Sequence, residues 1–324
     1  MSPQRLKLLG AIVLLSLCFG GRLVAQPIEF TRVQRLTNHE VALTLTAPVG
    51  RAYRVESAAS LTAWGGLFTF PTNATTSLQY TDAAAPFLAM RYYRAVELTG
   101  TNLISGDHLA TGQGDAIIQP RNHATFVLQW NGKMIYLDPV PTATYTGLPK
   151  ADLILVTHTH SDHFNTATID AVRGPVCAII APQAVYDGLS AAQKTIAIVL
   201  ANNASVDLLG VAIHAVPAYG ASHALGVGNG YVLGIGGKRI YVSGDTGDQP
   251  EIRALTDIDI AFVSMNQPYT MTVGAATNCV RALRPRVVYP YHYRDQSGAT
   301  TNAATFKQWL GTDLGIEVRL RNWY

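Results

Sequence analysis

The feature that most constrains this chain of 324 residues is the motif HTHSDH at 158–163, which directly follows the apolar segment ADLILVT. In an extended loop, side chains two positions apart point the same way, so His158 and His160 can bind one metal ion. After a tight bend, Asp162 and His163 face a second position beside the first. Four ligands do not complete two coordination shells, so the motif predicts further metal ligands elsewhere in the chain.

Two more residues of the metal-binding type follow predicted strands. Asp245 lies in SGDTG after the segment KRIYV, and His292 lies in YPYHY after the segment RVV. Together with the motif, residues of this type therefore lie at the ends of three predicted strands. Because α/β folds place their sites at the ends of strands, we expect these residues to meet at one site.

From about residue 115 onward, predicted strands and helices alternate. Asn131-Gly132 separates two strand-like segments and is a strong hairpin signal. Further strands are expected at 151–157, 176–182, 230–236, 238–245, 257–264 and 286–293, and helices at 166–174, 189–202 and 273–284. Apolar strands with helices between them indicate a layered α/β domain whose sheets carry helices on their outer faces.

Residues 28–98 have a different pattern, made of short strands. In the segment EVALTLTA, Val41, Leu43 and Leu45 alternate with small or polar residues, which is the period of a half-buried strand. Similar segments follow, separated by stretches rich in turn residues. This spacing predicts a small β-sandwich domain, and it contains no cluster suited to acid/base or metal chemistry. Residues 99–114, rich in Gly, Thr and Asp, are expected to hold the linker to a catalytic domain at 115–324.

Residues 1–25 have the pattern of a secretory signal peptide. Arg5 and Lys7 precede an apolar run at 8–19, and the small residue Ala25 marks a cleavage site. The run is short for a bilayer span, which favours cleavage over an uncleaved anchor. A bulky residue before Cys18 argues against a lipoprotein. We therefore expect a periplasmic or extracellular protein with no membrane span in the mature chain.

Composition excludes several classes of protein. Charged residues make up 14% of the chain and hydrophobic residues 48%, whereas disordered chains have the opposite balance. The formal charge of +3 comes from the leader, which holds three of the 24 basic residues and none of the 21 acidic ones. A neutral mature chain lacks the basic surface that nucleic acids require. Cys177 and Cys279 lie in apolar or helical patterns and are expected to be buried thiols rather than a disulfide.

These motifs resemble those of the metallo-β-lactamase superfamily. The resemblance covers roughly residues 115–324 and rests on the motif at 158–163, Asp245 and His292. The segments VPAY, GYVL, RIYVSGDTG, PEIRAL and YTM are similar to the branch of L-ascorbate-6-phosphate lactonase-like hydrolases. The resemblance implies an αββα sandwich, an α/β fold with two adjacent metals in a cleft between the sheets, here preceded by a small all-β sandwich domain.

The resemblance also implies which residues bind each metal. The first metal is expected to be bound by His158 and His160, the second by Asp162, His163 and His292, with Asp245 bridging the two. The third histidine of the first metal has two candidates, His223 in the loop PAYGASHALG and His214 in the strand-like segment VAIHAV. We favour His223 because binding sites favour loops. A first metal held by two histidines and Asp245 is a further alternative.

The donor set predicts both the metal and the chemistry. Imidazoles with a few carboxylates and no cysteine suit Zn²⁺, two ions per chain, with Fe and Mn as alternatives. Two ions about 3.5–4 Å apart hold a bridging water and lower its pKa to roughly 7, giving a hydroxide nucleophile. Asp162 is the expected catalytic residue, orienting that nucleophile and carrying a proton.

The sequence therefore predicts a secreted, zinc-dependent hydrolase of a small-molecule substrate. The branch resemblance favours a lactone or a related cyclic ester. A phosphodiesterase, a β-lactamase and a non-catalytic surface-binding protein are the alternatives. No NAD-binding or ATP-binding motif is found.

Several residues near the motifs have two interpretations. Asp138 in YLDP either supports a metal-binding histidine or caps the turn before Pro139. His123, at a strand edge, either lies near the cleft or only satisfies hydrogen bonds, and the second interpretation is favoured. For three tyrosines, core packing is expected rather than contact with substrate: Tyr219, Tyr269 and Tyr291.

Overall fold

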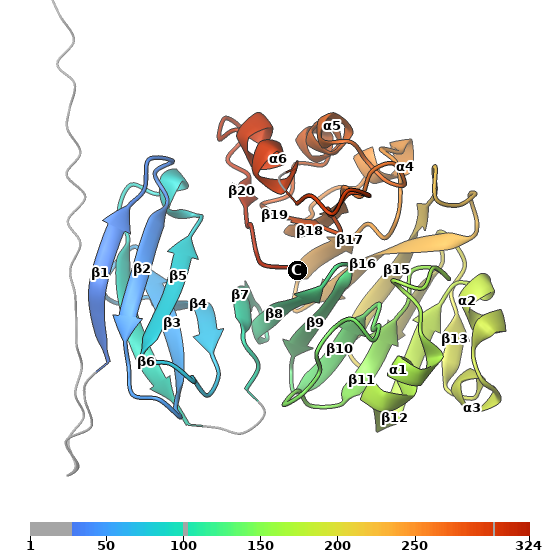
Figure 1. The fold of residues 1–324 in the computed structure, drawn as a ribbon, viewed down its shortest axis with the longest axis horizontal. Coiled ribbons are helices and arrows are strands. Elements are labelled where there is room, and N and C mark those ends of the chain that lie inside the picture. The colour runs from blue at the N-terminus through green and yellow to red at the C-terminus, as the bar shows by residue number, and fades with distance from the viewer. Residues whose placement is uncertain (1–27, 100–102, 301) are drawn as a thin grey trace, which may run out of the picture. The chain divides into compact units, whose positions relative to one another are not determined.

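The fold is that of a computed structural model, which describes residues 28–99, 103–300 and 302–324. The predicted signal peptide and residues 100–102 of the predicted linker lie outside these ranges. The chain divides between Leu109 and Ala110 into two compact units. All the α-helices of the described ranges belong to the second unit, as Figure 1 shows.

The first unit is built from antiparallel strands. One sheet has the order β1-β2-β5, and in the other β6 pairs with β3, β3 with β4, and β4 with Gly106 and Asp107 of β7. Leu43 and Leu45 of β2 enter a core that Val55 of β3 shares, so the predicted alternation in this segment is confirmed. The bounds are β1 (Glu29–Arg35), β2 (Val41–Thr46), β3 (Ala52–Ala58), β4 (Gly65–Phe70), β5 (Ser77–Asp82), η1 (Ala85–Phe87), β6 (Tyr92–Leu98) and β7 (Gly106–Thr111).

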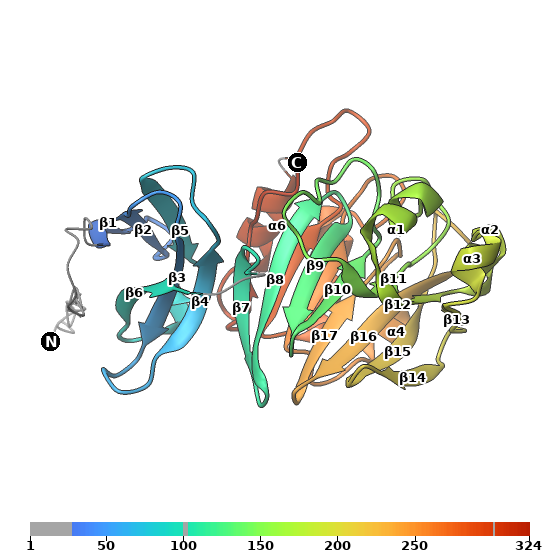
Figure 2. The same ribbon diagram turned by 90° about the horizontal axis from the view of Figure 1, so that it is seen from below.

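The second unit contains two mixed sheets. In the first of them, β8, β9 and β10 are antiparallel, and β11, β12 and β13 continue in parallel from β10. Figure 2 shows β8 to β12 side by side in chain order. The bounds are β8 (Gly114–Asn122), β9 (Thr125–Trp130), β10 (Lys133–Leu137), β11 (Ala151–Leu155), β12 (Arg173–Ala181) and β13 (Ala197–Val199).

The second sheet repeats this plan. Strands β14 to β17 form an antiparallel meander, and β18, β19 and β20 continue in parallel from β17. The bounds are β14 (Ser205–Leu208), β15 (Val211–Ala218), β16 (Gly228–Ile235), β17 (Lys238–Val242), β18 (Ile260–Ser264), β19 (Val287–Tyr291) and β20 (Glu317–Val318). Strands β18 and β19 are buried along their whole length, as expected for parallel strands covered on both faces.

Apolar side chains join the two sheets of the second unit. Phe126 of β9 and Phe262 of β18 stack with their ring centroids 4.2 Å apart, and the Tyr231 hydroxyl donates to the carbonyl of Val156. Helices α4 to α6 lie along the second sheet in Figure 1, and α1 lies beside β11 and β12. The predicted αββα arrangement is confirmed. The helices are α1 (Thr166–Val172), α2 (Gln183–Gly188), α3 (Ala191–Lys194), α4 (Pro250–Arg253), α5 (Val273–Leu283) and α6 (Asn302–Leu310).

Local sequence signals explain most of these boundaries. Asn131 and Gly132 both have positive φ, so the predicted two-residue hairpin turn is confirmed. Thr272 caps the N-terminus of helix α5, because its side chain accepts a hydrogen bond from the Ala275 amide. Arg284, in the left-handed region, caps the C-terminus.

The predicted helix at 189–202 is wrong in its second half. Helix α3 ends at Lys194, and Ala197–Val199 forms β13, which pairs in parallel with β12. The segment carries β-branched residues from Thr195 to Val199, which favour a strand once a neighbouring strand is available.

Two further observations concern membranes and thiols. Within the described ranges, no helix combines the length and the apolar character that a bilayer crossing requires. Cys177 and Cys279 are both free and buried, which confirms the expected pair of buried thiols.

Candidate metal centre

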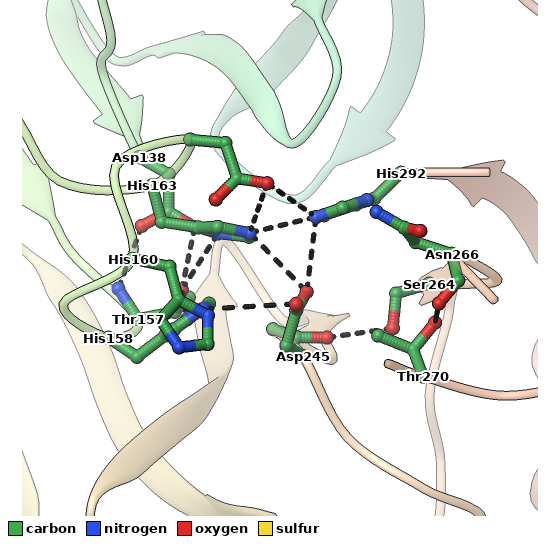
Figure 3. Close-up of polar contacts among 12 residues, drawn as sticks. Asp138, Thr157, His158, His160, His163, Asp245, Ser264, Asn266, Thr270 and His292 are labelled. Atoms are coloured by element: carbon green, nitrogen blue, oxygen red, sulfur yellow. Dashed lines mark hydrogen bonds and ion pairs between the residues drawn. The ribbon is translucent and has the colours of Figure 1, made fainter. Parts of the chain in front are cut away.

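Three loops that follow parallel strands bring the predicted site residues together. The motif at 158–163 follows β11, Asp245 follows β17, and His292 follows β19, so both sheets contribute. Figure 3 shows His158, His163 and His292 turned toward Asp245. His163 and His292 are fully buried and Asp245 nearly so. The expectation that these strand ends meet at one place is confirmed.

One set of four side chains surrounds a single point. The Nε2 atoms of His163 and His292 are 2.9 Å apart, and each lies 3.4 Å from Oδ1 of Asp245. Oδ2 of Asp162 lies 3.3 Å from Nε2 of His292 and 3.8 Å from Nε2 of His163. Ligands at ~2.0–2.2 Å from a tetrahedral ion lie roughly 3.3–3.6 Å from one another. This set therefore fits one metal ion.

Asp138 fixes the orientation of one of these histidines. Its Oδ2 accepts hydrogen bonds from Nδ1 of His163 at 2.7 Å and from the Thr157 hydroxyl, and its Oδ1 accepts one from the Thr157 amide. With the proton on Nδ1, His163 turns the lone pair of Nε2 toward Asp245 and His292. Of the two interpretations of Asp138, the structure favours support of a metal-binding histidine.

The remaining histidines form a second set beside the first. Nε2 of His158 lies 3.1 Å from Nδ1 of His160 and 3.9 Å from Oδ2 of Asp245. The His223 ring lies 4.8 Å from that of His158 and 6.0 Å from that of His160, measured between centroids. Gly228 packs against this ring so closely that a Cβ there would collide with it.

Buried atoms without hydrogen-bond partners support a metal at both sets. In the described structure, both ring nitrogens of His223 and Oδ1 of Asp245 are buried and make no hydrogen bond. Such groups cost free energy unless another partner satisfies them. Metal ions at the two sets would do so, and the residues present fit the metal pair that the sequence predicts.

His214 lies apart from these sets. It sits in β15 opposite Ser205 of β14, and its Nδ1 is 2.9 Å from the Ser205 hydroxyl. Of the two candidates for the third histidine, the structure brings His223, and not His214, next to His158 and His160.

The carboxylates of the site are held in their ionised form. Burial opposes ionisation of Asp245, but the charges of His292 and His163 hold its pKa well below the usual range. Burial also opposes ionisation of Asp162, whose pKa is held well below the usual range by hydrogen bonds from His123 and His292. Metal-binding carboxylates must be ionised, so both are ready to act as ligands.

Two opposed effects, burial and nearby charges, act on the pKa values of the imidazoles. Burial and the charge of His163 lower the pKa of His158 well below its usual value, and burial lowers the pKa of His223, which leaves neutral rings with free lone pairs. Burial would also lower the pKa of His163, but the carboxylates of Asp245 and Asp138 outweigh it and raise that pKa. The centre of the site therefore favours positive charge, which a divalent cation would supply.

The backbone is strained at three residues around the site. His123, Asp138 and His292 all have positive φ, between 44° and 55°. Non-glycine residues in this region are uncommon, and they cluster at functional sites where the surroundings hold them in place. Each of the three presents its side chain to the ligand sets.

Two residues at the site escaped the sequence analysis. Nε2 of His123 lies 3.0 Å from Oδ2 of Asp162, and Nδ1 of His123 lies 3.0 Å from the hydroxyl of Tyr324. His123 was expected to make hydrogen bonds, but not with a predicted metal ligand. No sequence motif marks Tyr324, because it lies 201 positions away from His123, the residue that it contacts.

The three tyrosines considered for substrate contact differ from one another. Tyr291 is fully buried, and its hydroxyl accepts a hydrogen bond from the Gly244 amide, so it holds the loop that carries Asp245. Tyr219 donates to Glu251, and Tyr269 is 44% exposed. Core packing is confirmed for Tyr291 and does not describe Tyr269.

Comparison with known proteins identifies the class to which this fold and site belong. Residues 118–292 match a family model described as the beta-lactamase superfamily domain. The match covers more than half of the chain, and the protein therefore belongs to the metallo-β-lactamase superfamily.

Its relatives define the group more closely, as the UPF0173 metal-dependent hydrolases. The member from Pyrococcus abyssi is 30% identical over 211 residues, which are 60% of this chain and 92% of that protein. The member from Thermococcus kodakarensis is 32% identical over 213 residues, with the same two coverages. The protein is thus a metal-dependent hydrolase.

Solved structures agree with this assignment. A Parabacteroides distasonis protein, provisionally assigned as a metal-dependent hydrolase, is 39% identical with a TM-score of 0.62, covering 68% of this chain and 99% of its own. Igni18, a metallo hydrolase from Ignicoccus hospitalis, is 25% identical with a TM-score of 0.56, covering 63% of this chain and 94% of its own.

Proposed function

We propose that the protein is a secreted hydrolase with two metal ions, most suitably Zn²⁺, that opens a lactone or a related cyclic ester. One observation carries the two-metal proposal: two ligand sets lie side by side and share Asp245, whose two oxygens face different histidines. Oδ1 faces His163 and His292, whereas Oδ2 faces His158. A carboxylate divided in this way suits a bridge between two ions.

The residues of the two sets then have separate tasks. The first ion would be held by His158, His160 and His223, and the second by Asp162, His163 and His292, with Asp245 common to both. When bound, a pair of ions supplies Lewis acidity, which lowers the pKa of water and polarises the attacked oxygen. Asp138 keeps His163 turned toward the second ion through the hydrogen bond to Nδ1.

Asp162 is the proposed catalytic residue because of its exposure. Its side chain is 42% exposed, whereas those of His163, His292 and Asp245 are at most 4% exposed. It is therefore the member of its set that both faces the second ion and reaches solvent. In this position Asp162 would orient the attacking water and take its proton.

The proposal of a lactone rests on the resemblance of VPAY, GYVL, RIYVSGDTG, PEIRAL and YTM to lactonase-like hydrolases. In the structure two of these segments lie at the site. RIYVSGDTG carries Asp245, and the amide of Tyr219 at the end of VPAY donates to the hydroxyl of Thr246. The resemblance of these two segments therefore concerns residues next to the proposed metal ligands.

Metal analysis and a substrate panel test this proposal together. We expect about two equivalents of metal per chain, and hydrolysis of lactones ahead of phosphodiesters and β-lactams, abolished by a chelator and restored by Zn²⁺. Fast hydrolysis of a phosphodiester but not of any lactone would reassign the substrate. Absence of metal after incubation with Zn²⁺ or Mn²⁺ would remove the two-metal proposal itself.

Secretion is proposed from the leader alone. Cell fractionation of a Gram-negative host followed by N-terminal sequencing should find the mature protein outside the cytoplasm, beginning at Gln26. A full-length chain in the cytoplasmic fraction would contradict it.

A further inference from the structure

His123 occupies a fixed place beside the second ligand set. It lies between β8 and β9, its amide donates to the carbonyl of Trp323, and its own carbonyl accepts from the amide of His292. The rings of His123 and His292 lie 3.8 Å apart between centroids. The side chains of His123, Asp162 and His292 come close enough to hold a metal ion themselves. His123 is therefore either a metal ligand or a residue that positions one.

The hydrogen bonds of Tyr324 indicate whether His123 is a metal ligand or a positioning residue. Its hydroxyl oxygen accepts from the amides of Tyr293 and Arg294, each at 3.0 Å, and lies 3.0 Å from Nδ1 of His123. Both amides can only donate, so among the contacts of this hydroxyl in the described part of the chain, Nδ1 is the acceptor for the phenolic proton. An Nδ1 that accepts a hydrogen bond carries no proton.

The contact of Nε2, on the other side of the His123 ring, independently indicates the same position for the proton. Nε2 of His123 lies 3.0 Å from Oδ2 of Asp162. An ionised carboxylate can only accept, so Nε2 must be the donor. A neutral imidazole has one N–H, and both contacts place it on Nε2.

We propose that Tyr324 is a positioning residue that, through the Nε2–H tautomer of His123, holds the Asp162 carboxylate in place for the second metal. The hydrogen bonds run in one direction, from the Tyr324 hydroxyl to Nδ1 and from Nε2–H to Oδ2. Because Nε2 bears a proton, His123 is not a ligand through that atom. Asp162 needs such support since its side chain is the exposed member of the ligand set.

The Tyr324 ring is itself held in place. The Arg294 guanidinium lies over it at 3.9 Å from the ring centroid, and the Tyr293 ring meets it edge-on at 5.2 Å. Tyr324→Phe keeps these contacts of the ring and removes only the hydroxyl. It is therefore the variant matched to the proposal.

Nitrogen NMR of protein labelled with ¹⁵N-histidine reads the tautomer directly. In the full-length protein, both metal-free and loaded with Zn²⁺, the His123 signal, assigned by its loss in His123→Gln, should have the pattern of the Nε2–H tautomer. In Tyr324→Phe it should change to a mixture of tautomers. A proton on Nδ1 in the unaltered protein, or loss of the Nε2 proton when Zn²⁺ is added, would overturn the proposal.

Metal affinity provides the second readout. Replacing groups that hydrogen-bond a metal ligand lowers affinity by roughly 10–100-fold. We expect a loss in that range for His123→Leu and a smaller one for Tyr324→Phe, measured by chelator competition. His123→Gln, whose amide nitrogen can still donate to Asp162, should stay within a few-fold of the unaltered protein. Melting of the metal-free variants controls for misfolding.

The two variants at position 123 separate positioning from ligation. Equal losses in His123→Gln and His123→Leu would show that His123 binds the metal, and no loss in either would show that the contact with Asp162 does nothing. The affinity readout rests on the proposed two-metal site, whereas the tautomer does not. A protein that binds no second metal but shows the Nε2–H pattern would contradict the proposed function and leave this hydrogen-bond chain standing.

Discussion

The first unit and the candidate metal centre of the second unit both bury carboxylates, but those carboxylates have different ion-pair partners. In the first unit, Arg54 and Arg94 contact Glu56, and Arg91 contacts Asp82 at 2.6 Å. A guanidinium keeps its charge at any ordinary pH, so these pairs are permanently neutralised. These ion pairs stabilise the fold of the first unit.

In the second unit, the ion-pair partners of the buried carboxylates at the site are histidines. Asp138 contacts His163, and Asp245 contacts His158, His163 and His292. An imidazole is charged only when protonated, so the balance of charge there depends on protons or on a bound cation. The comparison teaches that the nature of the partner, more than burial itself, marks a buried carboxylate as functional.

The largest expected effect is the loss of turnover in Asp162→Asn. The change keeps the shape of the side chain but removes the charge that, in the proposed mechanism, binds metal and takes a proton. Such groups contribute roughly 10²–10⁴-fold to the rate. Steady-state kinetics on the best substrate of the panel measures it, with circular dichroism as the control for folding. Turnover at the parental rate would show that Asp162 has no catalytic role.

Removal of His223 should cost one of the two metals. His223→Ala should lose about one equivalent, since a missing ligand weakens binding more than the roughly 10–100-fold expected for a supporting group. His214→Ala is the matched control and should lose none, because His214 pairs with Ser205 instead. Elemental analysis decides, and the reverse result would move the ligand to β15.

Loss of charge at Asp138 should have an intermediate effect. Asp138→Asn weakens the hydrogen bond that orients His163, so affinity for the second metal should fall by roughly 10–100-fold. Asp152→Asn is a suitable control, because Asp152 accepts from the Met134 amide in the same sheet and is no part of the ligand sets. Equal affinities in the two variants would mean that Asp138 serves the fold alone.

In the first unit, breaking a charge pair should change stability and leave the metal untouched. Arg91→Leu deprives buried Asp82 of a partner, which should lower the free energy of unfolding by about 1–3 kcal/mol. The exposed pair of Arg281 and Asp313 is the control, and Arg281→Leu should cost less than about 1 kcal/mol. Denaturant titration and metal analysis of both variants test the contrast, which fails if Arg91→Leu loses metal.

The smallest effect on the metal content is expected from removing residues 1–102, which hold strands β1 to β6 of the first unit. A chain that begins at Leu103 should remain soluble and retain its metals, because every ligand and supporting residue named above lies beyond that point. Expression and elemental analysis test this independence. Loss of metal would show that the site requires the first unit, whereas loss of activity alone would indicate that this unit shapes access for the substrate.

Much of the fold, and the meeting of most of the candidate ligands at one site, could be predicted because the signals are local. The motif at 158–163 contains four candidate ligands in six residues, and Asp245 and His292 each follow an apolar strand. Prediction failed at 189–202, where apolar residues suit a helix and a strand equally until a neighbouring strand is present. Ala197–Val199 forms a strand because it pairs with β12.

The sequence by itself determined which types of residue lie at the strand ends that form the site, since residue type and strand-end position depend only on neighbours in the chain. Only the tertiary structure brought His223, and not His214, next to His158. It also turned Asp138 toward His163 and joined Tyr324 to His123 across 201 positions. Hydrogen bonds of this kind depend on where separate strands end in space. Spacing along the chain does not encode them, because the loops between those strands can vary without moving the strand ends.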